Sequence, residues 1–187
     1  MGDFVQCLAE RDRLYGKPVR EERKKMAEKA REVVDRLIKR KEHISFAESC
    51  TGGLAAAALV DIPDASRVFD ASFVTYANEA KMKYLGVDEK TIETFGVVSE
   101  EVAGEMARGC AKANEAEVGV GISGVAGPGG GTEKKPVGMV CFGFFVNGRT
   151  ETFTRYFGEI GRNEVRRRSV EFVYEHLCEM LEEAPLC

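Results

Sequence analysis

Short apolar runs alternate along the chain with longer segments whose apolar residues recur at helical spacing. The apolar runs predict buried strands at residues 43–48, 71–76, 118–123, 137–146 and 150–157. The helical spacing predicts helices at residues 20–41, 51–60, 78–85, 100–113 and 163–183. Strands and helices thus alternate over the first two-thirds of the chain, and a pair of strands and a long helix follow.

Turn and capping residues mark several of these boundaries. Gly86 is expected to end the helix at 78–85, and Ser99 to cap the helix that reaches Ala113. Asn147-Gly148, between the last two strands, is a strong signal for a two-residue hairpin. The order of elements predicts an α/β fold with a mixed sheet and helices on both faces, in a single domain. We expect that domain to span residues 20–187, after an arm or short helix at 1–19.

Composition and charge narrow the class of protein. A chain of 187 residues with 44% hydrophobic residues suits one globular domain. The formal net charge of −4 disfavours nucleic-acid binding, which needs a basic surface. No apolar run resembles a signal peptide or approaches a membrane span, so no membrane partner is expected. The six cysteines contain no C-x-x-C pair and four lie in apolar or helical stretches, which indicates free thiols in a reducing, cytoplasmic setting.

The most informative stretch is the turn after the first predicted strand. Ser49-Cys50-Thr51-Gly52-Gly53 follows an apolar strand and precedes an alanine-rich helix. A strand, a glycine turn and a helix aim backbone N–H groups at one point, so a serine here could attack a substrate or hold an anion. A Ser-His-Asp triad is not available, because His43 and His176 lie outside every motif and are expected to be structural.

Several ordered motifs between residues 44 and 181 carry a family resemblance. They are Ala47-Glu48-Ser49-Cys50-Thr51-Gly52-Gly53, Phe73-Val74-Thr75-Tyr76-Ala77-Asn78-Glu79-Ala80-Lys81, Gly96-Val97-Val98-Ser99, Ile122-Ser123-Gly124-Val125-Ala126-Gly127-Pro128, Lys135-Pro136-Val137-Gly138, and Arg162 with Arg166-Arg167. The chain resembles the CinA C-terminal domain family, the nicotinamide-nucleotide amidohydrolases. Many relatives carry a further N-terminal domain, for which this chain is too short, so it looks like the stand-alone form.

The resemblance implies a three-layer α/β/α sandwich with a mixed sheet. It implies hydrolysis of the carboxamide of nicotinamide mononucleotide to nicotinic acid mononucleotide and ammonia, in pyridine-nucleotide salvage. It also implies that no metal or other cofactor is required and that the protein is a homo-oligomer. By similarity to the family, Ser49, Tyr76 and Lys81 form the catalytic group.

This group can be given chemical roles. We expect Ser49 to attack the carboxamide carbon, Lys81 to take the serine proton, and Tyr76 to relay or orient that proton. A lysine can act as a base when its surroundings lower its pKa. The alternative for Lys81 is a solvent-exposed helix lysine, as Lys83 is expected to be. Cys50 is a rival nucleophile, because a thiol at a helix N-terminus can have a lowered pKa, but it lacks a partner base.

Other residues are candidates for binding the substrate. Thr51 with Gly52 and Gly53 could offer N–H groups to an oxyanion, or Thr51 could be a plain helix N-cap. Ser123 is carried over from the family as a site hydroxyl near the carbonyl or the ammonia, and its alternative is an ordinary serine at a strand end.

The glycine-rich segment 124–132, which includes Gly127, could cradle the phosphate or ribose, or could be a flexible loop. It matches neither the ATP-binding nor the dinucleotide-binding glycine motif. Arg162 is the first candidate for a phosphate partner, with Arg166, Arg167 and Arg168 as adjacent alternatives. Glu48 could bury its carboxylate at the edge of the site and tune Lys81; the sequence assigns it no role.

Two other classes of function remain in view. A non-catalytic nucleotide-binding or regulatory module could share this fold, but it would not need the combination of Ser49, Tyr76 and Lys81. A DNA-associated competence factor rests only on the historical name of the family, and the acidic balance argues against it.

Overall fold

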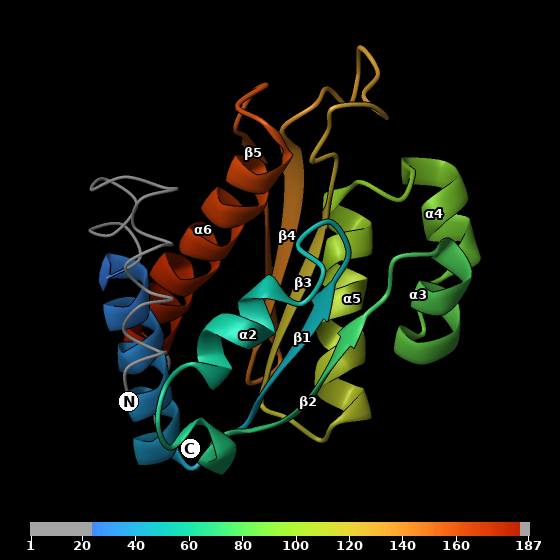
Figure 1. Cartoon of the computed structure of the whole chain (residues 1–187). Coiled ribbons are helices and arrows are strands. Elements are labelled where there is room, and N and C mark those ends of the chain that lie inside the picture. The colour runs from blue at the N-terminus through green and yellow to red at the C-terminus, as the bar shows by residue number, and fades with distance from the viewer. Residues whose placement is uncertain (1–23, 184–187) are drawn as a thin grey trace, which may run out of the picture.

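A computed structural model describes residues 24–183 of the chain and shows one five-stranded sheet between two layers of helices (Figure 1). The strand order is β2-β1-β3-β4-β5. β1 runs parallel to β2 and β3, whereas β4 is antiparallel to β3 and β5. The strands are β1 (Ile44–Glu48), β2 (Phe69–Val74), β3 (Val118–Gly124), β4 (Met139–Val146) and β5 (Arg149–Tyr156). The predicted single-domain α/β/α sandwich with a mixed sheet is confirmed.

Each face of the sheet is covered by its own helices. On one face lie the helix at residues 24–40, α2 (Leu54–Val60) and α6 (Arg162–Glu183), which share a large apolar core with the sheet (Figure 1). On the other face lies α5 (Glu100–Ala113), flanked by α3 (Asn78–Leu85) and α4 (Glu89–Phe95). The short 3-10 helix η1 (Ala65–Arg67) links α2 to β2.

Glycines let α5 lie directly against the middle of the sheet. A Cβ atom on Gly121 of β3 would overlap the carbonyl oxygen of Ala103, and one on Gly143 of β4 would overlap the same carbonyl group. The neighbouring β3 residues Val120 and Ile122 point to the opposite face and join its core. The alternation of glycine with β-branched residues therefore places the helix backbone close on one face and packs apolar side chains on the other.

The predicted boundaries agree with the structure in some places and differ in others. α3 ends at Gly86 in the left-handed conformation, and Ser99 caps α5 by accepting from the Val102 amide, as predicted. Asn147 and Gly148 form the turn between β4 and β5, both with positive φ. The helix predicted at 51–60 begins only at Leu54, because the preceding two glycines have positive φ angles of 61° and 92°, outside the helical region.

One further prediction was wrong, one helix was not predicted, and one prediction lies outside the described residues. β2 runs from Phe69 to Val74, so Tyr76 follows the strand instead of ending it. The sequence pattern missed α4, which has seven residues and buries none of them, so it carries no periodic apolar signal. The arm predicted at residues 1–19 lies outside the described residues. No helix among those described is long and apolar enough to cross a membrane.

The close approach of α5 leads to a prediction on stability. Gly121→Ala should lower the free energy of unfolding by about 1 to 3 kcal/mol, because the added methyl group meets backbone atoms that cannot move aside. Gly129→Ala is the matched control, since a Cβ atom there meets nothing within 4 Å. Chemical denaturation of both variants measures the effect, and equal stabilities would contradict the packing argument.

Candidate active site

The parallel pairing of β1 with β2 brings two loops to the same edge of the sheet. Glu48 at the end of β1 is paired with Val74 at the end of β2, so both chains leave the sheet side by side. The loop after β1 carries Ser49, and the chain after β2 leads into α3, which carries Lys81. Loops at the carboxyl ends of neighbouring parallel strands are where α/β proteins place their sites.

A short chain of hydrogen bonds joins Ser49 to Lys81. The Lys81 Nζ atom donates to Ser49 Oγ at 3.2 Å and to the Thr75 carbonyl oxygen at 2.7 Å. The Thr75 amide in turn donates to the Glu48 carbonyl oxygen at 2.9 Å. Because Glu48 precedes Ser49 in the chain, these three hydrogen bonds form a closed path. That path holds the serine hydroxyl and the lysine amine next to each other. The structure thus brings together the two side chains that the sequence pairs.

Lys81 is an unusual lysine because its side chain is buried. Its exposed fraction is 1%, whereas Lys83 on the same helix is exposed. Burial lowers the pKa of the Lys81 amine from the ordinary value of 10.5, while Cys50 and Glu79 oppose that shift. A solvent-exposed role for Lys81 is therefore excluded, and a larger fraction of its amine is neutral near pH 8 than in a free lysine.

Some backbone amides of the turn donate hydrogen bonds within the protein, and others do not. The Gly52 amide donates to the Ser49 carbonyl oxygen, and the Gly53 amide donates to the Glu48 carboxylate at 3.0 Å. Within residues 24–183, the amides of Cys50 and Thr51 donate to no other residue. The buried Thr51 hydroxyl also has no hydrogen-bond partner there, and Gly53, not Thr51, is the N-cap residue of α2. The free donors of the turn are therefore those of Cys50 and Thr51.

Tyr76 makes no hydrogen bond to the Ser49–Lys81 pair among the described residues and contacts a different predicted residue. Its hydroxyl accepts from Arg162 Nη2 at 2.9 Å, and Arg162 Nη1 donates to the Gly127 carbonyl oxygen at 2.9 Å. Tyr76 is 64% exposed, and no hydrogen bond of the described chain links it to Ser49 or Lys81. Arg162 thus ties the glycine-rich loop after β3 to the chain after β2.

The four arginines at the start of α6 have different hydrogen-bond and ion-pair partners. Arg166 is one helical turn after Arg162, and its Nη2 atom donates to the Thr51 carbonyl oxygen at 2.8 Å. Arg167 pairs with Glu164 and Glu171. Arg162 and Arg166 are therefore the two arginines that contact the predicted site.

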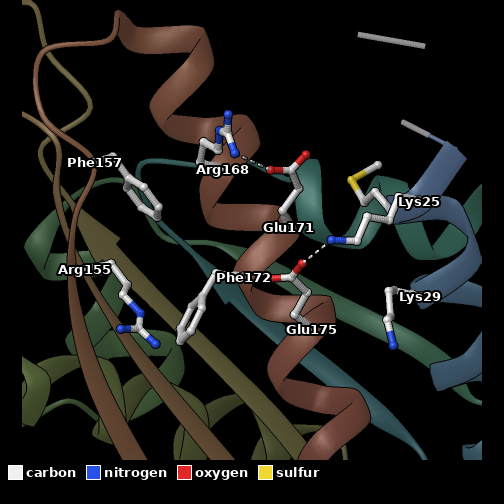
Figure 2. Close-up of a pocket in the computed structure, with 9 residues that line it drawn as sticks. Lys25, Lys29, Arg155, Phe157, Arg168, Glu171, Phe172 and Glu175 are labelled. Atoms are coloured by element: carbon white, nitrogen blue, oxygen red, sulfur yellow. Dashed lines mark hydrogen bonds and ion pairs between the residues drawn. The ribbon is translucent and has the colours of Figure 1, made fainter. Parts of the chain in front are cut away.

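Arg168 lines a cavity away from the Ser49 turn, which α6 shares with β5 and the helix at 24–40. Figure 2 shows it there beside Glu171, with Phe172 below it. None of the described residues that line this cavity is a serine, threonine or cysteine. This cavity therefore offers no hydroxyl or thiol nucleophile.

Cys50 is a buried neutral thiol, and the Ser123 hydroxyl is already engaged in a hydrogen bond. The Cys50 thiol is 5% exposed, and burial raises its pKa to about 12, with Glu48 adding to the shift and Arg166 opposing it. The thiol therefore stays neutral near pH 7, and a neutral thiol is a poor nucleophile. The buried Ser123 hydroxyl donates to the Val97 carbonyl oxygen at 2.7 Å, which leaves only its lone pairs free.

The histidines and the cysteines suggest no other chemistry. His176 packs among Phe144, Phe153 and Phe172, and His43 pairs with Asp70. The described cysteines, at positions 50, 110, 141 and 178, are free and buried, as expected. No three His, Cys, Asp or Glu side chains between residues 24 and 183 could hold a metal ion together.

Sequence reasoning missed Thr75 as a contributor to this arrangement, and it named Glu48 and Arg166 without assigning their contacts. Thr75 acts through its carbonyl oxygen, so its side chain gives no signal. Glu48 is identified as part of the turn only by its hydrogen bonds to amides that follow it. Arg166 stood among three adjacent arginines, and only the orientation of α6 distinguishes it.

Curated relatives match most of this chain. A CinA-like protein of Petrotoga mobilis is 45% identical over 148 residues, which cover 79% of this chain and 36% of that protein. A CinA-like protein of Endomicrobium trichonymphae is 48% identical over 134 residues, which cover 72% of this chain and 31% of that protein. The chain thus spans about a third of the length of these relatives.

Solved structures share both fold and sequence with the chain. The competence/damage inducible protein CihA from Agrobacterium tumefaciens has a TM-score of 0.81 and 41% identity, over 85% of this chain and 96% of that one. The competence damage-inducible protein A from Klebsiella pneumoniae has a TM-score of 0.82 and 34% identity, over 86% and 99%. The sequence model of the CinA C-terminal domain matches residues 26–181. On these grounds the chain belongs to the CinA C-terminal domain family.

Proposed function

We propose that the chain is an amidohydrolase that converts nicotinamide mononucleotide to nicotinic acid mononucleotide and ammonia. The observation that carries the proposal is the 3.2 Å contact between the buried Lys81 amine and the Ser49 hydroxyl. A nucleophilic serine needs a base within hydrogen-bond reach, and a lysine with a lowered pKa can be that base. The resemblance to the nicotinamide-nucleotide amidohydrolases supplies the substrate.

In the first step, Ser49 Oγ attacks the carboxamide carbon while its proton passes to the neutral Lys81 amine. In the neutral amine the 3.2 Å contact reverses: the Ser49 hydroxyl donates to the nitrogen lone pair, while one N–H of the amine still donates to the Thr75 carbonyl oxygen. The carboxamide oxygen becomes an oxyanion, and the free amides of Cys50 and Thr51 are the donors closest in sequence to the nucleophile.

In the second step, the C–N bond breaks and Lys81 returns the proton to the departing nitrogen, so ammonia leaves. Ser49 then carries the nicotinoyl group as an ester. Water attacks this ester, Lys81 takes a proton from the water, and the serine hydroxyl recovers that proton as the acid departs. Each step needs only groups of this site and water.

The phosphate of the substrate is expected to bind to positively charged side chains. Arg162 and Arg166 both reach the site from one face of α6, and guanidinium groups bind phosphate in pairs of hydrogen bonds. Tyr76 and Gly127, both bound to Arg162, would then line the nucleotide side of the site. Ser123 stays a proposed site hydroxyl near the carbonyl or the ammonia, where its lone pairs could accept a hydrogen bond. A cytoplasmic location and a homo-oligomer complete the proposal; free buried thiols support the location, and family resemblance supports the oligomer.

Ammonia release tests the proposed function directly. Ser49→Ala and Lys81→Met should each lower the turnover of nicotinamide mononucleotide by roughly 10³-fold or more, because each removes one half of the nucleophile–base pair. Lys83→Ala is the matched control, since Lys83 is on the same helix but exposed, and its turnover should equal that of the wild type.

Lack of turnover by the wild type on nicotinamide mononucleotide and its riboside would instead favour a non-catalytic binding module. Unaltered turnover in Ser49→Ala would reject the nucleophile while leaving the substrate open.

The lowered pKa of Lys81 predicts the dependence of the rate on pH. Because the base must be neutral, kcat/KM should rise with pH through the pKa of Lys81 and reach a plateau before pH 10.5. The folded state releases this proton at a lower pH than the unfolded state, so the free energy of unfolding should also rise with pH between the folded-state pKa and 10.5.

A pH–rate profile and denaturation curves at several pH values measure the two effects. Lys81→Met should remove this contribution to the pH dependence of stability. A rate that is flat or falls across this window would rule out Lys81 as the base.

Cys50 should behave as an inert thiol. Iodoacetamide at pH 7.5 should leave Cys50 unmodified in the folded protein, because the thiol is buried and its pKa is about 12. Mass spectrometry of the peptide that contains Cys50, taken alongside ammonia release, measures the modification. Rapid labelling of Cys50 with a parallel loss of activity would make the thiol the nucleophile.

A further inference from the structure

The Glu48 side chain is a fully buried carboxylate directly before the candidate nucleophile. One of its oxygens accepts from the amides of Gly53 and Ala55 at 3.0 and 3.1 Å, and the other accepts from the amide of Ala56 at 2.9 Å. No lysine, arginine or histidine between residues 24 and 183 forms an ion pair with it. The buried charge is therefore held by backbone amides alone, which are the first amides of α2.

This arrangement decides which amides the site can offer to a substrate. A helix N-terminus normally presents its free amides to an anion, but here Glu48 already occupies three of those around the start of α2. Cys50 and Thr51, one turn earlier, keep amides that donate to no other described residue. The anion at the start of α2 is thus the protein's own Glu48 carboxylate. The amides that remain available are those of Cys50 and Thr51, which directly follow Ser49.

The same turn is held from its other side by α6. The Tyr174 hydroxyl donates to the Ala55 carbonyl oxygen at 2.7 Å, and Arg166 donates to the Thr51 carbonyl oxygen at 2.8 Å. Glu48 also reaches the base, because its own carbonyl oxygen accepts from the Thr75 amide and Thr75 binds Lys81. A displacement of Glu48 would therefore be passed on to both the nucleophile and its base.

We infer that Glu48 is a positioning residue for the proposed hydrolysis: its carboxylate fixes the Ser49 turn on α2 so that the amides of Cys50 and Thr51 receive the oxyanion. This inference rests on the proposed function. Glu48 touches neither substrate nor Lys81 in this scheme and acts through the backbone. The charge would not tune Lys81, because burial is the first cause of the lowered pKa there and the opposing charges are Cys50 and Glu79.

Glu48→Gln tests the inference, because glutamine has the same shape but must turn an N–H₂ group towards amide donors. We expect kcat for ammonia release to fall roughly tenfold or more while KM stays within about threefold, since the lost interaction acts on the transition state. Labelling of Ser49 by a fluorophosphonate should slow in parallel. That reagent carries no nicotinamide, so it reports the reactivity of the serine independently of the substrate.

Glu42→Gln is the matched control. Glu42 is also a buried carboxylate, 2% exposed, but it lies just before β1, at the opposite end of that strand, and accepts from Arg40 and Asn147. Its replacement should lower stability without changing the labelling rate of the folded protein. A folded Glu48→Gln variant that is labelled and turns over like the wild type would overturn the inference and leave Ser49 as the nucleophile.

A measurement on the wild type covers the case in which Glu48→Gln does not fold. The phosphonyl oxygen of the labelled Ser49 stands in for the oxyanion, so the amide proton resonances of Cys50 and Thr51 should move downfield in the adduct. Those of Gly53, Ala55 and Ala56 should stay in place, and a downfield shift of these three instead would overturn the inference. Labelling without ammonia release would reject only the proposed substrate, whereas the absence of both would reject the nucleophile and this inference with it.

Discussion

The arrangement at this edge of the sheet depends on the burial of one amine. Lys81 is removed from water, donates to the Thr75 carbonyl oxygen and to Ser49 Oγ, and has a lowered pKa because burial disfavours the ammonium form. Burying an amine costs stability unless its hydrogen bonds are made, and here a main-chain carbonyl and a hydroxyl make them. In the proposed mechanism this burial would supply a base without a histidine. His43 and His176 instead take part in surface contacts and packing elsewhere.

The second constraint is the small number of backbone amides in a tight turn. Between Ser49 and Ala56, the amides donate to the carbonyl oxygens of Ile122, Ser49 and Thr51 and to the buried Glu48 carboxylate. Those of Cys50 and Thr51 donate to no other described residue. The backbone conformation decides which amides bind Glu48. Because the two glycines have positive φ angles, α2 begins only at Leu54, and the chain before it folds over the Glu48 side chain. The same burial that serves Lys81 disables Cys50, since burial favours the neutral form of both a lysine and a thiol.

Local signals in the sequence were sufficient for much of the fold. The Asn147-Gly148 hairpin, the Gly86 helix end and the Ser99 cap all occur as predicted, because each depends on the conformational preferences of a few adjacent residues. α4 was missed, because a helix that buries no residue leaves no periodic pattern to detect. The alternation of strands and helices was enough to predict a mixed sheet with helices on both faces, since each apolar face must be covered by another layer. The family resemblance implied the three-layer sandwich.

The sequence by itself determined which residue types could take part: a serine on a glycine turn, a lysine after the second strand, and arginines at the start of the last helix. Only the tertiary structure decided their partners. It placed Lys81 against Ser49, gave Tyr76 to Arg162 instead, and turned Arg166 but not Arg168 towards the turn. Motif spacing records the order of residues along the chain, whereas burial and hydrogen bonding depend on which segments the parallel β1–β2 pairing and the packing of α6 bring side by side.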